Sequence, residues 1–175
     1  NFIQALALAD SAYKYTVQKA DIHFFKGRIY SELGRFTEAE QAYKNALKAA
    51  PSYRGVWNNL GNNAYRQQNF SEAVDYYIQE VTQNQAPIPL RALGRAFVEL
   101  GKTDSARTLF QKAIDLDMNY AAAYFNLAQL EEDEGNFKQA IQHAGRAYGI
   151  ESDNLEYGYA YSTLLVQMDR GSEAI

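Results

Sequence analysis

An alanine returns along this chain at an almost constant interval. The six positions are Ala5, Ala39, Ala73, Ala106, Ala140 and Ala174, separated by 34, 34, 33, 34 and 34 residues. A constant period between about 20 and 50 residues is typical of repeat proteins, in which one unit cannot bury its apolar face alone and stacks on the next. The period therefore predicts an array of similar units.

Other residues keep the same register as the alanine. An aromatic residue follows it by four positions in Tyr43, Tyr77 and Phe110, and a second small residue follows it by seven in Ala12, Ala46, Ala113 and Ala147. Residues at these spacings share one face of an α-helix. Twelve residues before the alanine lies another small position, occupied by Gly27, Gly61, Gly94, Ala128 and Ser162. A small residue there allows two helices to approach closely, so each unit is predicted to be a pair of packed helices.

One unit carries Trp57, Leu60, Gly61, Ala73 and Tyr77 at spacings that resemble the tetratricopeptide repeat. Units with Gly94 and Ala128 are similar to the same pattern. The resemblance covers essentially the whole chain and implies an all-α fold, an α-solenoid of antiparallel helix pairs wound into a right-handed superhelix. We call the first helix of each repeat the A helix and the second the B helix.

The family pattern divides the chain into repeats. It places full repeats at 20–53, 54–86, 87–120 and 121–154, a partial repeat at 155–175, and the second helix of a preceding repeat at 1–19. Residues 1–175 are thus expected to form a single array. Because both ends fall inside a repeat, we expect a fragment of a longer array whose uncapped ends allow end-to-end self-association.

The turns within and between repeats carry helix-breaking residues. Asn69, Thr103 and Asn136 are predicted to cap the B helices with their side-chain oxygens, and Pro87 to start an A helix. Segment 84–89 is interpreted as an altered turn between repeats.

Glu80 occupies a position where other repeats have alanine. A buried carboxylate is costly without a partner, so we expect a locally shifted helix whose Glu80 reaches solvent. The alternative is a functional irregularity.

Composition excludes several function classes. A net charge of −4 gives no electrostatic footprint for nucleic acid, and no apolar run approaches the roughly 20 residues that span a bilayer. The chain has no cysteine, so it has neither disulfides nor thiolate chemistry, and the compartment stays unknown.

No motif points to catalysis. The acidic run 131–134 is interpreted as a solvated helix end, and His23 and His143 lack neighbours at metal-ligand spacing. Neither a phosphate-binding loop nor a nucleophile elbow is present. We therefore expect no enzyme activity, no metal and no cofactor in this chain.

In this family the concave wall formed by the A helices is the expected binding surface. Its positions here are aromatic, amide-bearing and basic: Phe24, Arg28, Asn58, Asn59, Asn62, Tyr65, Arg66, Arg91, Arg95, Phe125, Asn126, Gln129 and Tyr159. Amides bond a peptide backbone, aromatic faces cover its side chains, and arginine holds a carboxylate. The predicted function is a non-catalytic protein–protein interaction scaffold that binds a protein or peptide.

Alternatives remain open for these positions and for the chain. The aromatic residues also suit a purely structural role, and the set of residues that binds chaperone tails in some family members is incomplete in every register. The array could instead be the substrate-recruiting arm of an enzyme whose catalytic domain lies elsewhere, or it could assemble with itself.

Overall fold

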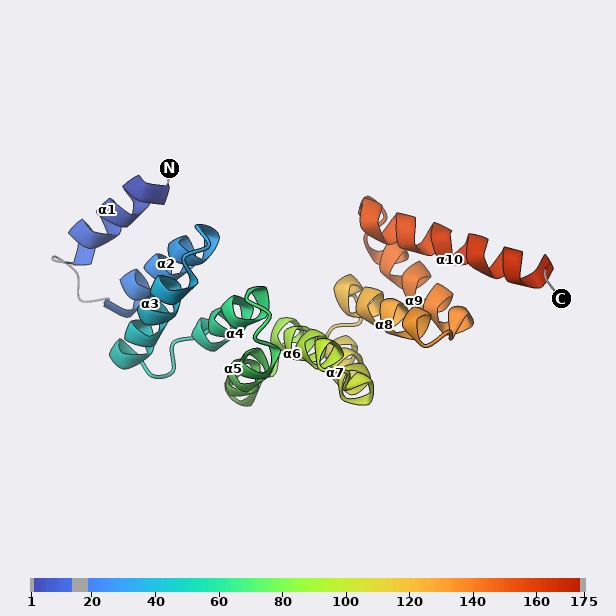
Figure 1. Ribbon diagram of the computed structural model, residues 1–175, viewed down its shortest axis with the longest axis horizontal. Coiled ribbons are helices and arrows are strands. Elements are labelled where there is room, and N and C mark those ends of the chain that lie inside the picture. The colour runs from blue at the N-terminus through green and yellow to red at the C-terminus, as the bar shows by residue number, and fades with distance from the viewer. Residues whose placement is uncertain (1, 14–18, 174–175) are drawn as a thin grey trace. The chain divides into compact units, whose positions relative to one another are not determined.

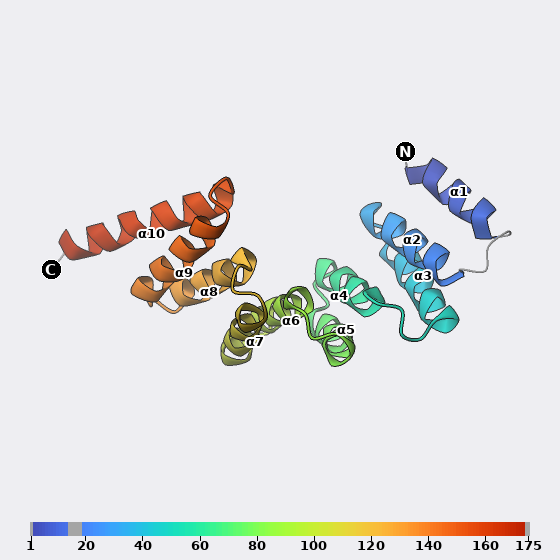
Figure 2. The same ribbon diagram turned by 180° about the vertical axis from the view of Figure 1, so that it is seen from behind.

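A computed structural model describes residues 2–13 and 19–173, and within them the chain consists of helices joined by short turns (Figures 1 and 2). The helices are α1 (Phe2–Tyr13), α2 (Lys19–Glu32), α3 (Phe36–Ala49), α4 (Val56–Arg66), α5 (Phe70–Gln83), α6 (Pro87–Glu99), α7 (Thr103–Leu116), α8 (Ala121–Asp133), α9 (Phe137–Ile150) and α10 (Leu155–Glu173). The described residues contain no strand, which confirms the predicted all-α fold. Ala174, the last alanine of the period, lies outside the described residues.

The chain divides into two compact units, residues 1–85 and 86–175. In the first unit, α2 packs on α3 and α4 on α5, and α3 also contacts α4. In the second, α6 packs on α7 and α8 on α9, and α7 and α9 contact the following helices α8 and α10. The A helices are therefore α2 and α4 in the first unit and α6, α8 and α10 in the second, in agreement with the predicted helix pairs.

The glycines of the A helices lie directly beneath aromatic rings of the B helices. A Cβ atom built on Gly61 would lie 2.5 Å from Cδ1 of Tyr77, and one built on Gly94 would lie 2.6 Å from Cε1 of Phe110. Gly27 lies against Tyr43 in the same way. The ring thus occupies the space that a side chain on the A helix would need, and only glycine permits this separation of the two helices.

The fourth repeat solves the same packing problem with different residues. Its A helix carries Ala128 instead of glycine, and its B helix carries Ala144 at the position of the aromatic ring. Both alanines are buried in one cluster with Leu164 of α10. Adding a methyl group on one helix is therefore accompanied by loss of the ring on the other.

The turns from A to B helices share one geometry. The second residue after the end of α2, α4, α6 and α8 has a positive φ: 72° at Gly34, 62° at Gln68, 70° at Gly101 and 79° at Gly135. The next amide then donates to a carbonyl oxygen of the last helical turn, from Arg35, Asn69, Lys102 and Asn136 to Tyr30, Ala64, Phe97 and Glu131, at 2.8–2.9 Å. These bonds satisfy carbonyl groups that the helix end would otherwise leave without a partner.

The predicted side-chain caps of the B helices are wrong. Asn69 and Asn136 lie at the N-cap positions of α5 and α9 but make no capping hydrogen bond, and Thr103 is already the first residue of α7. The side-chain amide of Asn136 instead donates to the carboxylate of Glu131 at 2.8 Å. The backbone bonds of the turn leave the cap residues in a conformation that does not aim their side chains at the first helical amides. Pro87 is the first residue of α6, as predicted.

The prediction that Glu80 reaches solvent is also wrong. Its side chain is buried, with 4% of the residue exposed. One carboxylate oxygen accepts a hydrogen bond from the amide of Asn58 at 3.3 Å, and the other accepts one from the Asn84 side chain at 3.4 Å. Helix α4 follows Gly55, which has no side chain to accept from the free amides of the first turn. Glu80 supplies that acceptor, and its negative charge is favourable at a helix N-terminus.

Gln68 is the one described residue other than glycine with a positive φ, so Gln68→Gly tests the turn geometry. Removing the Cβ relieves strain in the left-handed conformation, while the added chain freedom of glycine offsets part of the gain. We expect Gln68→Gly to raise the free energy of unfolding by about 0.5–1 kcal/mol in urea titrations. The matched control Gly101→Gln should lower it, and a loss of stability in Gln68→Gly would contradict the account.

Candidate functional site

In the first unit, most of the predicted binding residues are engaged within the unit. The ring of Phe24 packs against Tyr53 and Tyr43, with centroids 5.2 and 5.9 Å apart. Tyr65 packs edge-on against Phe70 at 5.3 Å. These two aromatic residues therefore help to hold the helices together, and Arg28 on the same face is exposed.

The asparagines of α4 are used in a similar way. The Asn59 amide donates to the carbonyl oxygen of Gly55 at 2.7 Å, and its oxygen accepts from the Tyr43 hydroxyl at 3.3 Å. The Tyr77 hydroxyl donates to Asn62 at 2.7 Å. The Oδ1 atom of Asn58 is buried without a hydrogen-bond partner among the described residues. Asn59 and Asn62 thus accept from the tyrosines that cover the A-helix glycines.

Arg66 joins two neighbouring A helices. Its Nη1 atom donates to the carbonyl oxygen of Ser31 at 2.9 Å, near the end of α2, and its guanidinium lies 5.0 Å from the ring centroid of Phe36. The Ser31 hydroxyl donates to the buried side chain of Asn63 at 2.6 Å. Since these bonds hold α2 and α4 together, Arg66 has a structural part in the first unit.

In the second unit, a chain of polar side chains runs from α6 to α8. The Nε atom of Arg91 donates to the Tyr120 hydroxyl at 2.9 Å, and its Nη1 atom donates to Oδ1 of Asn126 at 3.4 Å. The Asn126 amide in turn donates to Gln129 at 3.2 Å. The partners of Arg91 are all neutral, so its orientation is set while its positive charge is not balanced by a carboxylate within these bonds. Arg95, one turn further along α6, is exposed.

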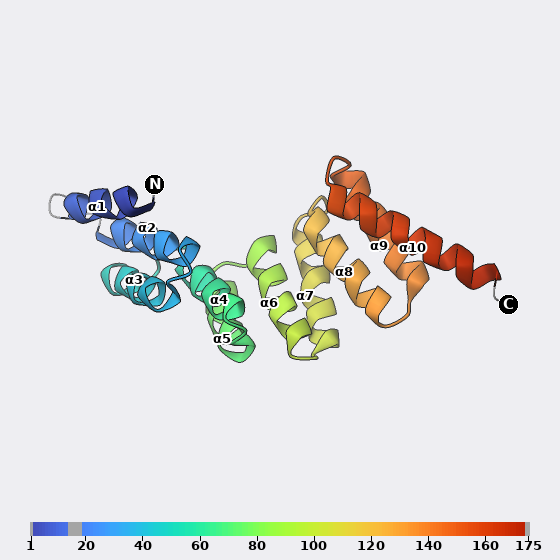
Figure 3. The same cartoon turned by 45° about the horizontal axis from the view of Figure 1, so that its top comes forward.

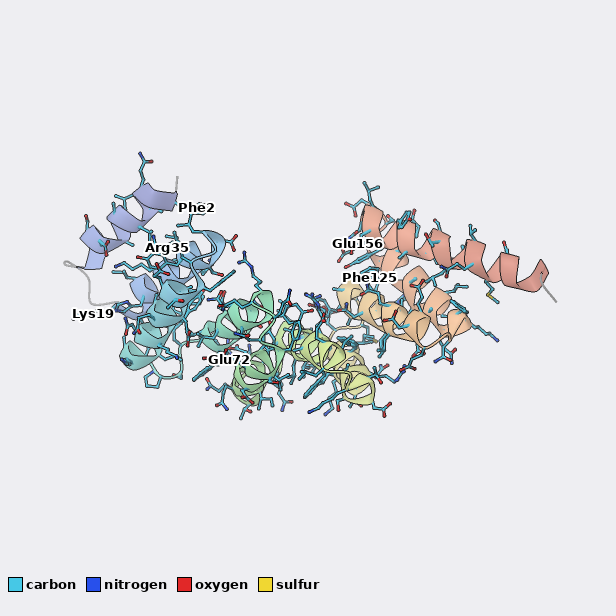
Figure 4. The ribbon with its side chains drawn as sticks, viewed as in Figure 1. Phe2, Lys19, Arg35, Glu72, Phe125 and Glu156 are labelled. Atoms are coloured by element: carbon cyan, nitrogen blue, oxygen red, sulfur yellow. The ribbon has the colours of Figure 1, made fainter. Side chains whose placement is uncertain are left out.

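Aromatic residues flank this polar chain. Phe125 packs against Tyr157 with ring centroids 4.9 Å apart, whereas Tyr159 has 77% of its surface exposed. Burial raises the pKa of the Tyr157 hydroxyl, and nearby Glu151 raises it further, so this group stays neutral. Figure 4 shows Phe125 and Glu156 near the first turns of α8 and α10. The second unit therefore presents an oriented arginine, two amides and one exposed aromatic ring on its A helices.

The acidic run 131–134 is only partly the solvated helix end that we expected. Glu131 is buried, with 6% exposed, and forms an ion pair with Arg107 of the preceding B helix. Arg107 also binds Glu134 at 2.6 Å. Because a buried carboxylate requires such compensation, this group of residues ties α7 to α8 and has a structural purpose.

Two further features of the described residues bear on function. No group of three or more histidine, cysteine or acidic side chains is close enough there to hold a metal ion. None of the helices described is both long enough and apolar enough to cross a membrane.

Family models agree with this geometry over most of the chain. A model described as "Tetratricopeptide repeat" matches residues 1–54 and 26–87, one described as "TPR repeat" matches 94–135, and a third, again "Tetratricopeptide repeat", matches 121–154. The chain belongs to the tetratricopeptide-repeat family. Repeats of this family act as protein-interaction scaffolds, and the resemblance seen in Trp57, Leu60 and Gly61 is confirmed.

Relatives of this tetratricopeptide-repeat chain are longer proteins. It is 28% identical over 144 residues to tetratricopeptide repeat-containing protein trd-1 of Caenorhabditis elegans, covering 81% of this chain and 18% of that protein. It is 30% identical over 155 residues to the human protein O-mannosyl-transferase TMTC3, covering 72% and 17%. The chain thus spans less than a fifth of either relative.

Among solved structures, the chain is similar to YrrB, described as a TPR protein with an unusual peptide-binding site. The TM-score is 0.70 with 17% sequence identity, and the match covers 92% of this chain and 84% of YrrB. At this identity the likeness supports the helical-repeat fold.

The lowered pKa of His143, in α9, should make the free energy of unfolding depend on pH. Burial lowers its pKa from the ordinary value of 6.5, and Arg107 lowers it further, against the opposite effect of Glu131. The unfolded chain therefore binds a proton at a higher pH than the folded chain. We expect the free energy of unfolding to fall as the pH drops below 6.5 towards the lowered folded-state pKa.

Urea titrations between about pH 7.5 and 5.5 measure this effect, because most carboxylates stay ionised in that range. His143→Gln should flatten the slope. The pKa of His23, in the first unit, is also lowered, so its protonation changes the free energy of unfolding in the same direction. His23→Gln therefore provides the matched comparison. An unchanged slope in the variant lacking both histidines would contradict the assignment.

Proposed function

We propose that this array is a non-catalytic scaffold that binds a segment of another protein on the A helices of its second unit. The observation that carries the proposal is the guanidinium of Arg91, held by Tyr120 and Asn126 without a carboxylate partner in those bonds. The two bonds use two of the five N–H donors of arginine, which leaves three for a ligand. A side-chain carboxylate or a backbone carbonyl of a bound segment suits these donors.

Neighbouring side chains complement such a segment. The amides of Asn126 and Gln129 match the donors and acceptors of a peptide backbone, and the exposed ring of Tyr159 offers a face for an apolar side chain. The first unit is the weaker candidate, because Asn59, Asn62 and Arg66 are already bonded to its own helices. The peptide-binding site named for YrrB supports peptide recognition at the level of the shared fold.

A second candidate function follows from the relatives. The human TMTC3 protein is named as an O-mannosyl-transferase, and the match covers 17% of it. In a protein of that kind, an array such as this one would recruit the substrate for a catalytic domain outside these 175 residues. The binding surface and its residues would be the same, so the two candidates differ in what is attached to the array.

To test the proposal, peptides are first selected from a random 12-residue phage library on the unmodified chain. Their binding to variants is then measured. We expect Arg91→Glu with Arg95→Glu to weaken a selected peptide at least about tenfold in fluorescence anisotropy, because the positive charge that holds it is reversed. Tyr159→Ala should weaken the same peptide without changing the circular dichroism spectrum.

Arg28→Glu with Arg54→Glu, two exposed arginines of the first unit, is the matched charge control and should bind normally. If neither the Arg91 and Arg95 variant nor Tyr159→Ala changes binding, the A helices of the second unit are not the binding face.

A further inference from the structure

The second unit has an edge at which its B helices end and its A helices begin. In Figure 3 the connections from α7 to α8 and from α9 to α10 lie on one side of this unit, where α6 also begins. Antiparallel pairs necessarily bring these ends together, since each B helix returns the chain to the starting side of its A helix. We call residues 87–89, 115–120 and 150–156 the loop edge of the second unit.

Large apolar side chains are exposed along the loop edge. The exposed fractions are 59% for Ile88, 54% for Leu116, 71% for Met118 and 88% for Leu155. Ile88, Leu116 and Met118 belong to the repeat at 87–120, and Leu155 begins the partial repeat at 155–175, so the exposure is found at both ends of the edge. Large apolar side chains exposed on one edge suit a protein-interaction site.

The same edge is acidic. The loop edge contains five carboxylates and neither lysine nor arginine: Asp115, Asp117, Glu151, Asp153 and Glu156. The hydrogen bonds that Asp115, Asp117 and Glu151 accept come from neutral donors: the side chain of Gln111, the backbone amide of Asn119 and the side chain of Asn154. No ion pair in the described part of the chain neutralises any of the five. The edge therefore carries a local negative field beside its apolar side chains.

The corresponding edge of the first unit lacks both properties. Between α3 and α4 the exposed residues are Pro51, Ser52 and Arg54, and Lys48 is exposed in the last turn of α3. Tyr53, the large apolar residue of this turn, is partly buried against Phe24. The repeat architecture alone therefore does not require an apolar, acidic edge, and this surface is particular to the second unit.

We propose that the loop edge of the second unit docks an amphipathic segment of a partner protein that carries lysine or arginine beside apolar side chains. Charge complementarity selects this occupant, because basic side chains pair with the five carboxylates while apolar ones cover Leu116, Met118 and Leu155. The surface consists of turns and helix ends, and it meets the row of Arg91, Asn126 and Gln129 at Tyr120, whose hydroxyl accepts from Arg91. It therefore gives the array a second interaction site whose charge is opposite to that of the first.

Two synthetic peptides test this proposal. The first is a 12-residue amphipathic helix with leucine on one face and lysine on the other, and the second has glutamate in place of each lysine. We expect the basic peptide to bind, with an affinity that falls as salt is raised, and the acidic peptide not to bind. Leu116→Ser with Met118→Ser and Leu155→Ser should weaken the basic peptide at least about tenfold in fluorescence anisotropy.

A charge variant, Asp115→Lys with Asp153→Lys and Glu156→Lys, should weaken the basic peptide at least as much and remove most of its salt dependence. Two matched controls change exposed residues at the opposite edge of the unit. One is Phe137→Ser, and the other combines Asp104→Lys with Asp133→Lys. Both should leave binding of the basic peptide unchanged. Arg91→Glu with Arg95→Glu should not weaken this peptide, which separates the loop edge from the proposed A-helix site.

Equal binding of the two peptides, or equal losses in the edge and control variants, would overturn the proposal. Sedimentation of the unmodified chain distinguishes another occupant. If the chain forms dimers that the Leu116, Met118 and Leu155 variant abolishes, a second copy covers this edge and the proposed basic partner is wrong.

Discussion

The contact between an A-helix glycine and a B-helix aromatic ring determines how the helices of this protein pair. Rings of Tyr43, Tyr77 and Phe110 fill the space above Gly27, Gly61 and Gly94, so neither partner can change alone without a clash or a cavity. The repeat with Ala128 shows the other solution, in which Ala144 takes the place of the ring. Within each unit, neighbouring A helices also contact each other, α2 with α4 and α6 with α8.

The chemistry of the same ring influences which polar side chains remain for a ligand. In the first unit the rings are tyrosines, and their hydroxyls donate to Asn59 and Asn62. In the second unit the corresponding residues are Phe110 and Ala144, which have no hydroxyl. Asn126 there accepts from Arg91 and donates to Gln129 instead. A packing residue on the B helix thus helps to explain why the two units differ as candidate binding surfaces, although both follow one repeat pattern.

The repeating pattern was sufficient to predict the helix pairs, because period and small residues report directly on packing. It failed where a single residue makes a contact that the pattern does not describe. Glu80 was expected at the surface, yet Gly55 leaves the start of α4 without a side-chain acceptor, and a buried carboxylate fills that need. The prediction of a solvated run fails at Glu131 because its partner, Arg107, lies 24 residues away in sequence. The predicted binding residues share equivalent positions on the A helices, and sequence alone does not show which of them, such as Phe24 or Arg66, make contacts within the protein.

The most direct test of the central contact is the effect of Gly94→Ala in two backgrounds, measured as the free energy of unfolding in urea. In the unmodified chain the new methyl group would meet the Phe110 ring, so we expect a loss of about 1–3 kcal/mol. In the Phe110→Ala background the ring is absent, and the same change should be neutral or stabilising, because alanine favours a helix over glycine by up to about 1 kcal/mol. Equal losses in both backgrounds would show that the ring does not set the separation of the helices.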